Sequence, residues 1–215
     1  IAKLHNVDFD KVNLTDYGKH ENYMDRQIHR WTKQYKDSET QMIPEINELI
    51  EWLPKNIPSD QETSIVHGDF RLDNMIFDPI THEVKAILDW ELSTLGNPIA
   101  DFTYHMMSWR LPAGAKGLGM MGSDLKSLNI PSESEYAELY YKKTGREKID
   151  NWDFYMAYNI FRLAGIAQGI VGRVRDGTAS SSEAKNYEAF VPILGKLGWS
   201  LSLIHISEPT RRKRI

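Results

Sequence analysis

The chain has 215 residues, of which 41% are apolar, and this composition is typical of one soluble globular domain. Its formal net charge of −4, with both signs interspersed, excludes a broad basic face for nucleic acid, and no apolar run reaches the length of a membrane span. The absence of cysteine excludes disulfides, thiolate catalysis and cysteine zinc sites. We therefore expect a cytoplasmic protein with small-molecule partners.

Helical periodicity dominates the first part of the chain. "IAKLHNVD" reads as the end of a helix, so we expect a segment to precede Ile1. Apolar residues recur at intervals of three and four over residues 22–37 and 43–58. This spacing predicts two amphipathic helices, the second ended by Pro54 and Pro58.

Three short apolar runs follow, and their composition favours strands. They are "TSIVHGD" at residues 63–69, "NMIFD" at 74–78 and "EVKAILDWE" at 83–91. The intervening "DPITH" has the residues of a turn. We predict a small β-hairpin from the last two runs, preceded by a strand and a loop.

The rest of the chain again predicts helices. Residues 97–112 carry a proline near the first turn, and 131–145 carry a capping box of Ser132 and Glu135. The long, mainly apolar stretch at 150–177 predicts the central buried helix, and residues 181–199 predict the last one. The expected fold class is α+β, mostly α, with a short β-hairpin.

The end of the chain has a different character. "LSLIHISEPTR", residues 201–211, resembles the translation of a transposase-type sequencing adapter, and a basic run follows it. We predict one domain over residues 1–200 and treat 201–215 as an artefact that is not a domain. A genuine basic tail is the alternative.

The stretch "VHGDFRLDNMIFD", residues 66–78, crowds charged and polar side chains beside predicted strands. A hairpin would bring Asn74, which begins one strand, beside Asp89, which ends the next. An amide and a carboxylate suit Mg²⁺, which prefers oxygen ligands and completes its shell with water and phosphate. Asp69 precedes Asn74 by five residues and could accept a proton from a substrate hydroxyl. Such an aspartate, followed by an asparagine and a later aspartate, is the kinase pattern.

The motifs "HGDFRLDN" and "LDWE" resemble those of the aminoglycoside phosphotransferase and choline kinase-like family. The longer block "VHGDFRLDNMIF…AILDWELSTLGNPIADF" looks especially like the phosphotransferase domain that is fused to acyl-CoA dehydrogenases of family members ten and eleven, and like free-standing bacterial relatives. The resemblance covers roughly residues 1–199.

The resemblance implies a protein-kinase-like C-terminal lobe and an ATP- and Mg²⁺-dependent phosphotransferase. Asp69 would be the catalytic base, Asn74 and Asp89 the magnesium ligands that also bind the nucleotide, and Asp101 an acid that supports the loop. The acceptor would be a small-molecule hydroxyl, such as that of a hydroxyacyl-CoA, and an acyl-CoA dehydrogenase domain or protein would be a partner. Nothing upstream of Asp69 resembles the family's N-terminal lobe, so we expect this lobe to be missing and the fragment to be inactive alone.

Other residues near the motif have two readings each. His67 is interpreted as structural support rather than as a metal ligand. Arg71 is a catalytic candidate that could contact the transferred phosphate, but it could equally pair with Asp73. Asp101 could be a plain acid at a helix N-terminus. Arg162, Gln168, Arg173 and Arg175 on the long helix suit either an anionic substrate or capping and ion pairing.

Two rival functions remain at this stage. One is a non-catalytic, pseudokinase-like binding module, although a degenerated site tends to lose one of its acids or ligands. The other is a metal-dependent phosphohydrolase, which needs more carboxylate or histidine ligands than this cluster offers.

Overall fold

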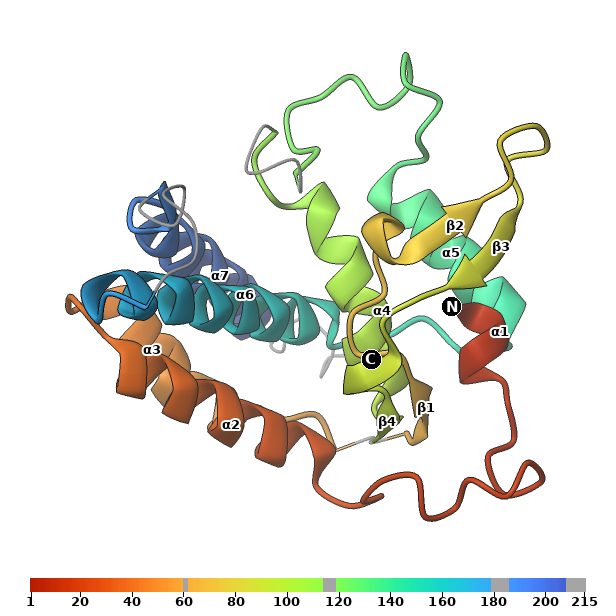
Figure 1. Cartoon of the computed structure of the whole chain (residues 1–215), viewed down its shortest axis with the longest axis horizontal. Coiled ribbons are helices and arrows are strands. Elements are labelled where there is room, and N and C mark those ends of the chain that lie inside the picture. Colours follow the sequence, from red (N-terminus) through yellow and green to blue (C-terminus); the bar gives the residue numbers. More distant parts are fainter. Residues whose placement is uncertain (60–61, 114–118, 179–185, 208–215) are drawn as a thin grey trace. The chain divides into compact units, whose positions relative to one another are not determined.

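The computed structural model describes residues 1–59, 62–113, 119–178 and 186–207 (Figure 1). For residues 205–207 it describes the backbone only. The fold is mostly helical, as predicted, and contains two small antiparallel sheets, of which the sequence predicted only the hairpin. The α-helices are α1 (Ala2–His5), α2 (Tyr23–Ser38), α3 (Pro44–Trp52), α4 (Pro98–Met106), α5 (Glu133–Thr144), α6 (Trp152–Arg175) and α7 (Phe190–Ser207). The strands are β1 (Ser64–Val66), β2 (Met75–Phe77), β3 (Val84–Ile87) and β4 (Thr94–Gly96). Short 3₁₀ helices are η1 (Leu53–Lys55), η2 (Leu72–Asn74), η3 (Trp90–Leu92) and η4 (Met107–Trp109).

The chain divides into two compact units, each built from two separate stretches. Residues Ile1–Glu21 and Asp60–Asp150 form the first, which we call the sheet unit because it holds all four strands. Residues Asn22–Ser59 and Asn151–Ile215 form the second, the helical unit, with α2, α3, α6 and α7. Across the described ranges, no helix combines the length and the hydropathy that a membrane span requires.

Helix α6 is the centre of the helical unit and packs against α2 and α7, while α3 packs against α7 (Figure 1). Its side chains are buried on nearly every face, as its apolar sequence predicts. Gly172 permits the close approach of α2, since a Cβ there would lie 2.8 Å from the Cβ of Ser38. The prediction of a central buried helix is therefore confirmed.

Helix α7 begins later than predicted. We expected a helix from residue 181, but the structure begins α7 at Phe190. Residues 186–187 have 3₁₀ geometry, residues 188–189 form a turn, and residues 181–185 lie outside the described residues. Pro192 gives the physical reason, because proline is tolerated in the first turn of a helix and breaks a helix interior. The helix then continues to Ser207, into the segment that we treated as an artefact, and the origin of that segment remains a prediction. Residues 208–215 lie outside the described residues.

The sheet unit contains the predicted hairpin and one pairing that was not predicted. β2 pairs antiparallel with β3, with Met75 opposite Ile87. β1 pairs antiparallel with β4, with Ile65 opposite Leu95. β4 was missed because three residues ending in glycine give no readable alternation.

Helix α4 follows β4 directly and packs against β1. Its N-cap is Asn97, whose side-chain oxygen accepts hydrogen bonds from the backbone N–H groups of Ile99 and Ala100 at 2.9 and 3.0 Å. Pro98 occupies the first turn, as predicted. This arrangement places Asp101, in that first turn, beside the loop that leaves β1.

Candidate functional site

The loop from β1 to β2 makes a sharp change of direction at Gly68. Its φ of 86° is a conformation that residues with a side chain rarely adopt. A Cβ at this position would also lie 2.7 Å from the backbone oxygen of Leu92. Glycine is therefore required between His67 and Asp69, for both reasons.

The Asp69 carboxylate is held by one oxygen. Asn74 Nδ2 donates hydrogen bonds to Asp69 Oδ2 at 3.1 Å and to the Asp69 backbone oxygen at 2.9 Å. Asp69 Oδ1 is buried and has no hydrogen-bond partner within the described ranges. A buried acceptor without a partner is unusual in folded proteins and often marks a functional position. The five-residue spacing of Asp69 and Asn74 thus fixes the carboxylate and leaves one oxygen available.

The β2–β3 hairpin brings Asn74 and Asp89 to the same end. Asn74 precedes β2, and its backbone oxygen accepts a hydrogen bond of 2.8 Å from the backbone N–H of Leu88. Asp89 follows Leu88, is exposed and has a φ of 62°, which turns the chain into η3. No cluster of three or more histidine and acidic side chains suited to a metal occurs in the described part of the chain. Any cation here would depend on few protein oxygens.

His67 links the loop to the hairpin. Its Nδ1 accepts a hydrogen bond of 3.2 Å from the Asp69 backbone N–H, so Nδ1 carries no proton. Its Nε2 therefore donates to the Leu88 backbone oxygen at 3.0 Å. The fully buried ring also lies 4.7 Å from the Trp90 ring. Both ring nitrogens are used within the chain, and neither remains for a metal.

Asp101 holds the backbone of the loop. Its two carboxylate oxygens each accept a hydrogen bond of 2.8 Å, one from the His67 N–H and one from the Gly68 N–H. Burial alone would raise the pKa of Asp101, but hydrogen bonds from His5 and from these backbone groups lower it below its ordinary value. A buried, ionised carboxylate therefore binds the backbone of His67 and Gly68, the two residues before Asp69.

His5 and Tyr140 complete this network and were missed from the sequence. His5 Nε2 donates to Asp101 Oδ2 at 3.1 Å, and His5 Nδ1 lies 2.7 Å from the Tyr140 hydroxyl. Burial lowers the pKa of His5, so the ring is neutral at pH 7 and Nδ1 accepts a hydrogen bond from the Tyr140 hydroxyl. Positions 5, 101 and 140 are so far apart in the sequence that no spacing pattern could reveal them.

Arg71 forms an ion pair with Asp73, one of the two partners considered from the sequence. The Asp73 side chain is exposed. A contact of Arg71 with a transferred phosphate stays a prediction.

Acid is expected to destabilise the chain through His105, whose ring packs 5.7 Å from that of Phe70 in the loop. Burial lowers the pKa of His105 from 6.5 to about 4, although a hydrogen bond to the Phe70 backbone acts in the opposite direction. The unfolded chain therefore binds this proton more readily than the folded chain does. Stability should be highest above pH 6.5 and should fall by about 2 kcal/mol between pH 6.5 and 4.

Urea unfolding at several pH values measures this dependence. His105→Gln keeps a donor for the Phe70 backbone and does not titrate, so its unfolding free energy should vary less with pH. An equally steep pH dependence in the variant would contradict the assignment to His105.

Comparison with known proteins identifies the family. Residues 1–139 match the Phosphotransferase enzyme family. The chain is 43% identical over 203 residues to acyl-CoA dehydrogenase family member 10 of Mus musculus and 38% identical over 204 residues to family member 11 of Homo sapiens. Each alignment includes 94% of this chain but only 19% and 26% of the relative, respectively.

A solved structure is similar over most of the chain. A crystal structure from Ralstonia eutropha, provisionally named an aminoglycoside phosphotransferase, is 50% identical and superimposes with a TM-score of 0.88. The match covers 93% of this chain and 61% of that one. With this similarity, the kinase-like fold class expected from the sequence is confirmed. The chain belongs to the phosphotransferase enzyme family.

Proposed function

We propose that this chain carries the catalytic loop of an ATP- and Mg²⁺-dependent phosphotransferase that moves the γ-phosphoryl group to a small-molecule hydroxyl. The observation that carries the proposal is the asymmetry of the Asp69 carboxylate, with Oδ2 held by Asn74 and Oδ1 buried without a partner. A base needs a fixed carboxylate with one oxygen available for the incoming hydroxyl.

In this proposal Asp69 orients the acceptor and takes its proton. The acceptor hydroxyl donates a hydrogen bond to Oδ1, and its proton moves to this oxygen as the acceptor oxygen bonds to the γ-phosphorus of ATP. The bond from the γ-phosphorus to the bridging oxygen of the β-phosphate breaks, and ADP leaves. Asn74 prevents the carboxylate from rotating away, and Asp101 fixes the backbone before it. Phosphoryl transfer depends mainly on positioning and electrostatics, so these contacts supply what the reaction requires from the loop.

Asn74 and Asp89 are the proposed magnesium ligands. The Asn74 amide nitrogen donates to Asp69, which leaves the amide oxygen as a ligand atom. Asp89, whose exposed carboxylate would be the second ligand, follows Leu88, and the Leu88 backbone N–H donates to the Asn74 backbone oxygen. Two oxygen donors fit Mg²⁺, which commonly takes one or two protein ligands together with water and phosphate. When bound, the ion would neutralise charge on the phosphates. Arg71 would contact the transferred phosphate only if its guanidinium left Asp73 and bound a phosphate oxygen instead.

The proposed acceptor is the hydroxyl of a hydroxyacyl-CoA, and the proposed partner is an acyl-CoA dehydrogenase domain or protein. The support is that the two mammalian relatives are named acyl-CoA dehydrogenase family members. The chain spans a fifth to a quarter of their length. We also propose that the 215-residue chain alone is nearly inactive. Its sequence upstream of Asp69 contains no recognisable elements of the lobe that binds the nucleotide in this family.

The test is ADP formation by the full-length protein with ATP, Mg²⁺ and a panel of hydroxylated compounds that includes hydroxyacyl-CoA. We expect ADP to form only with both Mg²⁺ and an acceptor. Asn74→Ala and Asp89→Asn should raise the Mg²⁺ concentration that gives half-maximal rate by roughly tenfold or more. Glu91→Gln, which removes an exposed acid two residues after Asp89, is the matched control.

Three results would contradict the proposal or change it. Absence of ADP with every acceptor would favour a binding module without catalysis. Phosphate release that needs no acceptor would favour a hydrolase. A Mg²⁺ requirement that changes equally in Glu91→Gln would remove Asn74 and Asp89 as ligands.

A further inference from the structure

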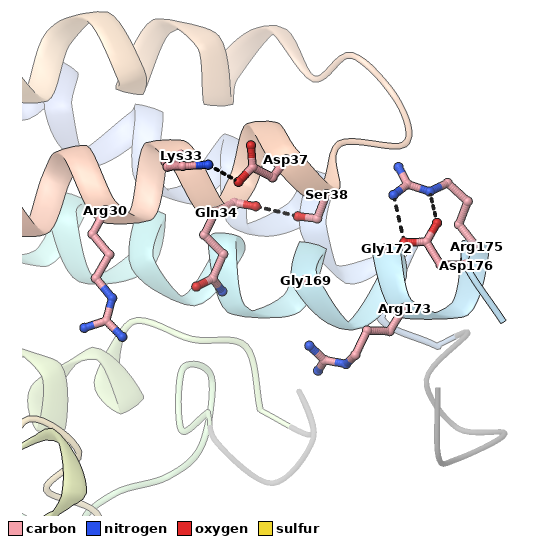
Figure 2. A pocket seen from close by; sticks show the side chains of 10 residues that line it. All are labelled: Arg30, Lys33, Gln34, Asp37, Ser38, Gly169, Gly172, Arg173, Arg175 and Asp176. Carbon is pink, nitrogen blue, oxygen red and sulfur yellow. Dashed lines mark hydrogen bonds and ion pairs between the residues drawn. The ribbon is translucent and has the colours of Figure 1, made fainter. Parts of the chain in front are cut away.

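A second feature of the molecule is a groove in the helical unit between α2 and the end of α6 (Figure 2). Its volume is about 510 Å³, which lies within the usual range for small-molecule sites. Five residues of α2 and five residues from Gly169 to Asp176 line it. It shares no residue with the loop of Asp69, so it is a separate candidate site.

Helical spacing places the polar side chains of the groove in rows. Arg30 and Gln34 are four residues apart on α2, and Gly169 and Arg173 are four residues apart on α6, so each pair shares a face. Gly169 contributes no side chain. A Cβ there would lie 3.4 Å from Gln34 Nε2 and 3.9 Å from Arg173 Nη1. Gln34 and Arg173 therefore lie over the same open stretch of α6.

The acids of the groove are already paired. Lys33 Nζ lies 2.5 Å from Asp37 Oδ2, and Arg175 donates to both oxygens of Asp176 at 2.7 and 3.1 Å (Figure 2). Of the residues considered from the sequence for an anionic ligand, Arg175 is thus occupied. Gln168 is occupied as well, since its Nε2 donates to the Ser38 backbone oxygen at 2.6 Å.

Arg30 and Arg173 are the cations that remain. Within the described ranges neither forms a hydrogen bond or an ion pair with an acid, and Figure 2 shows both reaching away from their helices to the side on which the Gln34 amide lies. Arg30 has one aromatic contact, with its guanidinium carbon 5.4 Å from the Trp31 ring centre. The groove therefore has an excess of two positive charges, one on each helix.

We propose that this groove binds the phosphate group of a small organic phosphate, with Arg30 and Arg173 as its ligands. Gln34 Nε2 donates one hydrogen bond of 3.3 Å to the Gly165 backbone oxygen, so only its second N–H would be available to the phosphate. A guanidinium group offers parallel N–H donors that match phosphate oxygens. Attraction to the negative end of a helix could explain Arg173 in the last turn of α6, but it does not explain Arg30 in the middle of α2. A phosphate ligand accounts for both.

Calorimetric titration of the 215-residue chain with pyrophosphate tests the proposal, in buffer with EDTA so that the proposed magnesium site contributes nothing. The double variant Arg30→Gln/Arg173→Gln should bind at least roughly tenfold more weakly than the natural chain. Glutamine preserves the polarity and part of the length of each side chain. Lys55→Gln/Lys196→Gln removes two exposed charges of the same unit outside the groove and should bind as tightly as the natural chain.

Each alternative outcome overturns the proposal. Binding that is unchanged in Arg30→Gln/Arg173→Gln would place pyrophosphate elsewhere. Equal weakening of both double variants would show a general effect of charge, and absence of saturable binding by the natural chain would show that the groove is not a phosphate site. Circular dichroism of all variants checks that each is folded. The result is independent of the proposed transfer reaction, because no catalytic step is measured.

Discussion

Asp69→Asn in the full-length protein is expected to lower kcat by a factor of about 10² to 10⁴, the contribution of a positioned base. Asparagine has the same shape, so its side-chain oxygen can still accept a hydrogen bond from Asn74, but an amide cannot take the acceptor's proton. KM for ATP should change little, since Asp69 is proposed to contact the hydroxyl acceptor. Steady-state kinetics with ATP and the best acceptor measure both constants.

The matched control for this experiment is Asp16→Asn. Asp16 is an exposed acid in the loop that follows α1, within the first stretch of the sheet unit. Its substitution should leave kcat unchanged. Full activity of Asp69→Asn would remove Asp69 from the reaction. A loss of equal size in Asp16→Asn would show that the assay responds to the charge of the protein rather than to the base.

Asp101→Asn is expected to have the largest effect on stability, about 2 to 4 kcal/mol. The carboxylate accepts one hydrogen bond at each oxygen from the backbone of His67 and Gly68. An amide can accept only one of them and turns its own N–H₂ group toward the other donor. The unfolding free energy from urea titration measures the loss, and kcat should fall with it because the loop before Asp69 is no longer fixed.

His5→Ala separates the parts of this network. It removes the hydrogen bonds to Asp101 and Tyr140 but preserves both backbone donors, so its effect on kcat should be smaller than that of Asp101→Asn. If the two variants lost kcat equally, the backbone hydrogen bonds would not be what positions the loop. If neither lost kcat, Asp101 would be an acid of the helix N-terminus with no influence on the site.

Local patterns were the part of the fold that the sequence could predict. The α2 and α3 helices, the β2–β3 hairpin and the capping box of α5 each depend on residues within a few positions of one another, and all were confirmed. The start of α7 was wrong because apolar spacing outweighed the position of Pro192. A proline that can occupy only the first turn is a better marker of a helix start than the spacing before it.

Long-range pairings could not be predicted. The spacing of Asp69 and Asn74 lies within one loop and was visible, and the structure joins the two side chains by a hydrogen bond. The β1–β4 ladder and the His5–Asp101–Tyr140 network join positions far apart in the chain, and a histidine in a short apolar helix carries no signal of its partner. The same holds for the two arginines of the groove, which come from helices more than a hundred residues apart. The assignments of the base and of the magnesium ligands stay predictions for the kinetic tests.

The interleaved order of the two units has a consequence for biosynthesis. α2 buries Met24, Ile28, Trp31 and Tyr35, and its partner α6 begins only at Trp152. At ordinary translation rates the ribosome needs on the order of ten seconds to make the intervening residues. During that interval the apolar face of α2 has no α6 to cover it, so the nascent chain should depend on a chaperone or on temporary contacts until α6 emerges. Ribosome-bound chains that stop before Trp152 should accordingly be much more sensitive to protease within α2 than chains that extend past Arg175.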